Sequence, residues 1–142
     1  MIRTIDETIS VAPQISPEDI PALAAAGFGF VINNRPEGEE SGQPSNAAIR
    51  AAAEAAGMGY AEIPTVMGGM TQAQVDEMAA ALASADKPVL AFCRSGTRSC
   101  NLWALAKASR GGDPEALIAK AADAGYDISG IRPLLHQLST RG

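Results

Sequence analysis

The chain has 142 residues, 46% of them apolar and 19% charged, which is the composition of a globular protein and suits a single domain over residues 1–142. Its net charge of −5 argues against nucleic acid as a partner, because phosphate backbones attract basic surfaces. No apolar run approaches the ~18 residues of a membrane span and residues 1–15 lack the features of a signal peptide, so we expect a cytoplasmic protein that does not bind membranes.

The first third of the chain alternates short apolar strands with a capped helix. Ile9–Ala12 is predicted as a strand, and Ser16 is the expected N-cap of a helix that ends near Gly27. Phe28–Asn33 is rich in aromatic and β-branched residues and is predicted as a buried strand. The polar stretch Asn34–Pro44, which contains two prolines and two glycines, is predicted as a long loop.

The same alternation continues to the end of the chain. The remaining strands are expected at Tyr60–Ile63 and Val89–Phe92, and the remaining helices at Ser45–Ala56, from Thr71 to about Ser84, at Ser99–Ser109, from Asp113 and from Ser129 to near Leu138. Strands that alternate with helices indicate βαβ units. We therefore predict an α/β fold with a mostly parallel sheet of four to five strands flanked by helices.

Cys93 lies at a favourable point of this pattern, directly after an apolar strand and just before a helix. The helix N-terminus directs free N–H groups and the positive end of its dipole at the loop. Arg94 and Arg98 add positive charge, and Gly96 permits a backbone conformation in which successive N–H groups turn inward. Each effect stabilises a thiolate, so we predict Cys93 as a catalytic nucleophile in an anion-binding loop. The alternative is a buried structural cysteine with solvated arginines.

Other residues are candidates for the same site. Arg98 is predicted to be catalytic, and the substrate-binding candidates in the loop are Arg94, Ser95, Gly96, Thr97 and Ser99. Arg35 also follows a strand end, and it either binds substrate or forms a surface ion pair with Glu37 or Glu39. The two cysteines match no zinc-ligand spacing, so we expect no metal or other cofactor, and Cys100 is expected to pack in the core.

The segment Cys93-Arg94-Ser95-Gly96-Thr97-Arg98-Ser99 resembles the active-site loop of rhodaneses and is similar to the phosphate loop of tyrosine and dual-specificity phosphatases. The wider chain from Ile9 to Leu105, including Asn33-Asn34-Arg35-Pro36 and Ile63-Pro64, resembles the phosphatase-like domain family of beta-lactamase hydrolase-like proteins. That resemblance implies a protein-tyrosine-phosphatase-like fold and a link with sulfide metabolism. The activity it implies is divided between phosphatase and sulfurtransferase.

Two departures from the phosphatase pattern favour sulfur transfer. The phosphatase arginine comes six positions after the cysteine, whereas here that position is Ser99 and Arg98 has the rhodanese spacing. The stretch from Pro64 to Met70, where such phosphatases carry an aspartate as general acid, contains no carboxylate, and Glu37, Glu39 or Glu40 would have to substitute.

The leading hypothesis is therefore a sulfurtransferase that moves sulfane sulfur through a persulfide on Cys93 to a thiol acceptor or cyanide. Its substrate would be a small anion or a sulfane-sulfur donor. The alternatives are a cysteine-dependent phosphatase with a phosphocysteine intermediate and a non-catalytic module that binds an anion or a redox partner.

Overall fold

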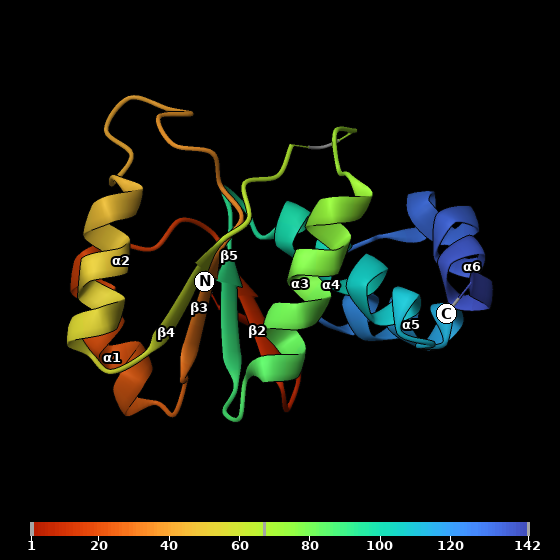
Figure 1. Cartoon of the computed structure of the whole chain (residues 1–142), viewed down its shortest axis with the longest axis horizontal. Helices are drawn as coiled ribbons and strands as arrows, with labels where there is room; N and C mark the ends of the chain where they lie inside the picture. Colours follow the sequence, from red (N-terminus) through yellow and green to blue (C-terminus); the bar gives the residue numbers. More distant parts are fainter. Residues whose placement is uncertain (1, 67, 142) are drawn as a thin grey trace.

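A computed structural model describes residues 2–66 and 68–141, and at its centre is a five-stranded sheet with the order β1-β2-β5-β3-β4 (Figure 1). Strands β2, β5, β3 and β4 are parallel, and β1 pairs antiparallel with β2 at one edge. The strands are β1 (Arg3–Asp6), β2 (Ile9–Ala12), β3 (Phe30–Asn33), β4 (Gly59–Glu62) and β5 (Val89–Phe92). The predicted α/β class and mostly parallel sheet are confirmed.

Helices cover both faces of this sheet, as Figure 1 shows. One face carries the short turn η1 (Pro17–Asp19) with α1 (Ile20–Ala25) and α2 (Asn46–Ala55). The other face carries α3 (Gln72–Ser84), α4 (Thr97–Ser109), α5 (Pro114–Asp123), the turn η2 (Ser129–Ile131) and α6 (Arg132–Arg141). Each face has its own apolar core, in which Trp103 on one side and Phe92 on the other are fully buried among aliphatic side chains. Of the helices in the described ranges, none has the length and apolar character needed to cross a membrane.

Local capping explains why the helices begin where the sequence predicts. The Ser45 side chain accepts from the Ala48 N–H at 3.1 Å and begins α2, and the Asp113 side chain does the same for α5 through Ala116. At α3, Thr71 and Gln74 exchange side-chain to backbone hydrogen bonds. These bonds satisfy N–H groups that the first turn of a helix leaves without partners.

Several predicted boundaries are wrong by one to a few residues. Strand β1 was not expected, because its sequence Arg-Thr-Ile-Asp carries little apolar signal, and it is held by pairing with β2. Strand β3 begins at Phe30, not at Phe28, and β4 is shifted one residue toward the N-terminus. The expected last helix begins as the turn η2 and becomes α-helical only at Arg132.

The start of α4 is the boundary that matters for the site. The sequence predicts a helix from Ser99, but α4 begins at Thr97, because Gly96 adopts a φ of 94° and acts as its N-cap. This left-handed conformation costs glycine little and other residues much more. Arg98 and Ser99 therefore belong to the first turn of the helix and have helical geometry.

Candidate active site

The carboxyl ends of the four parallel strands meet at one edge of the sheet, and each contributes a residue to the site. Gln14 follows β2, Arg35 follows β3, Thr65 follows β4 and Cys93 follows β5 directly. Ligands of open parallel sheets bind at this edge. Asn34 connects the ends of three neighbouring strands. Directly after β3, its N–H donates to Phe92 O of β5 at 2.8 Å, and its side-chain amide donates to Ile63 O, after β4, at 3.0 Å.

The loop between β5 and α4 turns the backbone N–H of Gly96 toward the cysteine. The N–H of Gly96 donates to Sγ of Cys93 at 3.0 Å. Cys93 is 0% exposed and lies between the buried strand β5 and the N-terminus of α4. The sulfur therefore accepts a backbone hydrogen bond and faces the positive end of a helix dipole.

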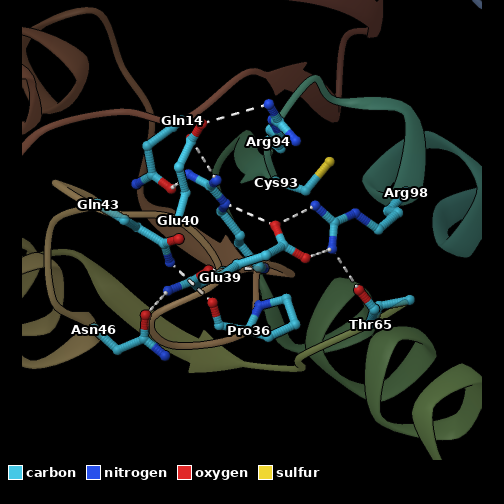
Figure 2. Close-up of polar contacts among 12 residues, drawn as sticks. Gln14, Pro36, Glu39, Glu40, Gln43, Asn46, Thr65, Cys93, Arg94 and Arg98 are labelled. Atoms are coloured by element: carbon cyan, nitrogen blue, oxygen red, sulfur yellow. Dashed lines mark hydrogen bonds and ion pairs between the residues drawn. The ribbon is translucent and has the colours of Figure 1, made fainter. Parts of the chain in front are cut away.

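Arg98 lies beside Cys93 and is held by two neighbours (Figure 2). Its Nη1 and Nη2 donate to the two carboxylate oxygens of Glu39 at 2.7 and 2.8 Å, and Nη1 also donates to Thr65 O at 3.0 Å. The hydrogen bonds to Glu39 raise the pKa of Arg98, although burial opposes them, and the neighbouring Cys93 acts in the same direction as Glu39. The guanidinium is thus fixed and charged.

Arg35 is buried, with 2% of its surface exposed, and each nitrogen of its guanidinium donates one hydrogen bond. Its Nε donates to Glu39 at 2.9 Å, Nη2 to Glu40 at 2.9 Å and Nη1 to the side chain of Gln14 at 3.1 Å. Burial lowers the pKa of Arg35, but the hydrogen bonds to Glu39 and Glu40 outweigh it, so the pKa is raised. Arg35 is therefore a buried guanidinium that pairs with the partly exposed Glu39 and the exposed Glu40, whereas Glu37 contacts Asn46.

The other loop candidates differ in exposure. The Arg94 side chain is 66% exposed, and its one ion pair with a described residue is with Glu40 at 3.4 Å. The Ser95 hydroxyl donates a hydrogen bond to the Thr97 hydroxyl at 3.1 Å on the exposed side of the loop. Ser99 is fully buried in α4, and its hydroxyl oxygen has no hydrogen-bond partner among the described residues. Of the candidates, the structure brings Gly96 and Arg98 to Cys93, whereas the Arg94 side chain is directed to Glu40.

Three glutamates of the loop 34–44 are the candidates to replace the missing general acid. Glu37 instead accepts from the Asn46 N–H at 3.1 Å and caps α2. Glu39 is held by Arg98 and Arg35, whose hydrogen bonds lower its pKa from 4.5 to about 2. The hydrogen bond from Arg35 also lowers the pKa of Glu40. In this arrangement Glu39 and Glu40 are carboxylates at neutral pH and cannot donate a proton.

Cys100, the second cysteine, packs in the core as the sequence predicts. It is 0% exposed, and burial, aided by the charge of Cys93, raises the pKa of its thiol to about 12. Across residues 2–66 and 68–141, no group of three or more His, Cys, Asp or Glu side chains is arranged to hold a metal ion.

The sequence interpretation missed the contacts that fix Arg98. Thr65 acts through its backbone carbonyl, which has no sequence signature, and Glu39 is a partner of Arg98 from 59 residues away. The only available signal was the spacing of Glu39 and Glu40 at four and five residues after Arg35, next to a strand end.

A buried cysteine follows a parallel strand, and its sulfur accepts from a loop N–H. An arginine lies in the first turn of the next helix. Together these features define a phosphatase-like α/β domain. The family model described as beta-lactamase hydrolase-like protein, phosphatase-like domain, matches residues 1–110, and the chain belongs to this family. The resemblance predicted from the sequence is thereby confirmed.

Two curated relatives are beta-lactamase hydrolase-like proteins. The protein from Agrobacterium fabrum is 42% identical over 107 residues, and that from Xylella fastidiosa is 36% identical over 106 residues. Each match covers 75% of this chain but only 25% of the relative, so the chain spans about a quarter of the length of these proteins.

Solved structures show the same fold over almost the whole chain. A candidate phosphatase from Neisseria meningitidis superposes with a TM-score of 0.82 and 32% identity, covering 96% of this chain and 97% of its own. Tk-PTP in its active form gives a TM-score of 0.75 at 19% identity, with 99% and 97% covered. The predicted protein-tyrosine-phosphatase-like fold is confirmed.

Proposed function

We propose that the chain is a cysteine-dependent phosphatase that hydrolyses phosphate monoesters through a phosphocysteine intermediate on Cys93. The observation that carries this proposal is the pairing of a sulfur that accepts the Gly96 N–H at 3.0 Å with a fixed arginine beside it. The phosphatase-like family and the candidate phosphatase from N. meningitidis support phosphate as the substrate group.

In the first step the Cys93 thiolate attacks phosphorus and forms an S–P bond, while the bond from phosphorus to the ester oxygen breaks. The leaving oxygen takes the electron pair and is protonated by solvent. In the second step water attacks phosphorus, the S–P bond breaks, and inorganic phosphate leaves as the thiolate reforms. The loop N–H groups and Arg98 stabilise the charge on the phosphoryl oxygens in both steps.

Donor counting indicates how Arg98 would bind the phosphoryl group. Glu39 and Thr65 use three of its five N–H groups. The two that remain, on Nε and Nη2, point in the same direction and form a second fork. That fork can make two parallel charge-assisted bonds to phosphoryl oxygens while Glu39 still holds the far edge of the guanidinium.

A second candidate, sulfur transfer through a Cys93 persulfide, is favoured by one observation. Arg98 follows Cys93 by five positions, the rhodanese spacing, and not by the six of phosphatases. The resulting smaller loop suits a sulfane sulfur, and sulfur transfer between soft nucleophiles needs little help from a general acid.

The two candidates are separated by measuring both activities on one preparation. We expect release of phosphate from p-nitrophenyl phosphate, loss of that activity in Cys93→Ser, and its retention in Cys100→Ala, which changes the buried second cysteine. Intact mass spectrometry should detect a phosphoryl group on Cys93 after rapid quenching. A sulfur adduct after thiosulfate, with thiocyanate formed from added cyanide and no Cys93-dependent phosphate release, would establish the sulfurtransferase. Neither activity would indicate a binding module.

A further inference from the structure

Tyr126 reaches the active-site loop from the segment between α5 and η2. Its hydroxyl donates to the backbone carbonyl of Ser95 at 3.2 Å. A Cβ atom on Gly96 would collide with this hydroxyl, so the tyrosine lies directly against the glycine backbone. Gly96 is therefore needed for its left-handed φ of 94° and also for the close approach of Tyr126.

The carbonyl that Tyr126 holds belongs to the same peptide unit as the N–H on the nucleophile. A trans peptide is planar, and its C=O and N–H point in opposite directions. The Ser95 carbonyl accepts from Tyr126 on the outside of the loop, while the Gly96 N–H donates to Sγ of Cys93 at 3.0 Å on the inside. A bond that fixes one end of this rigid unit therefore fixes the other.

Tyr126 is itself anchored. The guanidinium of Arg3 lies 6.0 Å from the centre of its ring and donates to Ala124 O at 3.3 Å, and the Tyr126 N–H donates to Ala121 O at 2.9 Å. Burial raises the pKa of Tyr126 above 10.0, so the phenol stays protonated and keeps its donor. The tyrosine is outside residues 1–110, the part that the family model matches.

We propose that Tyr126 is a positioning residue for Cys93, holding the Ser95–Gly96 peptide so that its N–H stabilises the thiolate. This inference rests on the proposed role of Cys93 as the nucleophile, but not on whether phosphorus or sulfur is attacked. It also assigns a role in the active site to the segment that follows the family match.

The test is the rate at which iodoacetamide alkylates Cys93 at a fixed near-neutral pH, followed by mass spectrometry. Tyr126→Phe removes only the hydroxyl and should slow alkylation by about threefold to tenfold, the effect expected for one hydrogen bond. The rate should approach that of the unmodified chain as the pH is raised and the thiolate forms in both proteins. The same variant should lower kcat for p-nitrophenyl phosphate more than it changes KM.

Tyr60→Phe is the matched control, because Tyr60 is the other tyrosine of the chain and its hydroxyl accepts from Asn33 of β3 and donates to Glu62 of β4. An equal loss of Cys93 reactivity in both variants, or unchanged reactivity in Tyr126→Phe, would overturn the proposal. If Tyr126→Phe does not fold, Arg3→Lys, which removes the bond to Ala124, should slow alkylation in the same way but less. Absence of both phosphatase and sulfurtransferase activity would instead refute the proposed function, since alkylation needs no substrate.

Discussion

Arg98 is the residue whose geometry most limits the chemistry at the site. Its side chain is 11% exposed, and Glu39 and Thr65 fix its Nη1 and Nη2 groups. The orientation of its remaining N–H groups is therefore fixed as well. Arg94 is close in sequence, but its side chain is 66% exposed and its ion pair with Glu40 is long, at 3.4 Å. The two arginines therefore differ in preorganisation although they carry the same charge.

This difference predicts unequal effects of the same substitution. Arg98→Lys keeps the charge but loses the planar fork, and turnover should fall by about 10²–10³-fold, the usual loss when one group that stabilises a developing anion is removed. Arg94→Lys is the control and should cause a much smaller loss. Steady-state kinetics of the two variants on one substrate checks this. Equal losses would mean that Arg98 contributes only general positive charge.

The lowered pKa of Glu39 predicts how the free energy of unfolding depends on pH. Arg98 and then Arg35 lower its pKa from 4.5 to about 2, which means that the folded state favours the carboxylate. The stabilisation is therefore fully present above pH 4.5 and is lost as the pH falls toward about 2. Glu39→Gln should lower the free energy of unfolding at neutral pH, and its difference from the unmodified chain should shrink over that window.

Urea unfolding at a series of pH values measures this difference. Glu54→Gln is the matched control, because it removes one exposed carboxyl from α2 that makes no ion pair within the described part of the chain. If both variants differ from the unmodified chain by the same amount at every pH, the Glu39 ion pairs do not contribute in the way that their geometry implies.

Among the elements, the segment from Pro64 to Met70 predicts which substrates are hydrolysed. It contains no carboxylate, and Glu39 and Glu40 are held as carboxylates by arginines. Since a positioned general acid is typically worth 10²–10⁴-fold, aryl phosphates, whose leaving groups need no proton, should react faster than alkyl phosphates by about that factor. Initial rates on a series of esters with increasingly basic leaving groups check this.

Restoring an acid tests the same idea in the opposite direction. Val66 is 50% exposed and follows Thr65, whose carbonyl contacts Arg98. Val66→Asp should accelerate alkyl esters selectively, and Val66→Asn, which has the same shape without the acid, should not. Comparable rates for aryl and alkyl esters in the unmodified chain would show that a group outside this segment supplies the proton.

Element positions were largely predictable because the signals that set them are local. Ser45, Thr71 and Asp113 cap helices through residues three positions away, and Cys93, Gly96 and Arg98 all lie within six residues of the end of a strand. Strand β1 could not be predicted, because it is stabilised by pairing with β2 and not by its own polar sequence. The clamp on Arg98 and the contact of Tyr126 join residues 59 and 31 positions apart, and only the folded chain brings them together.

In the whole molecule, α4 links the active site to the C-terminal helices. It starts at the Gly96 cap and is buried almost along its length, between α3 and the pair α5 and α6. Leu117, Ile128, Leu135 and Leu138 pack on this side from outside the family match. Four such side chains are worth roughly 6–12 kcal/mol by burial, which is comparable to the roughly 5–15 kcal/mol stability of an ordinary domain.

Two adjacent leucines of α6 test whether this packing is part of the fold. Leu135 is 0% exposed and Leu134 is 42% exposed. Leu135→Ala should lower the free energy of unfolding by about 2–5 kcal/mol, because it leaves a cavity against α4. Leu134→Ala removes the same atoms at the surface and should change it by no more than about 0.5 kcal/mol. Denaturant midpoints of both variants give the comparison, and equal small effects would mean that α6 contributes little to the stability of the core that carries Cys93.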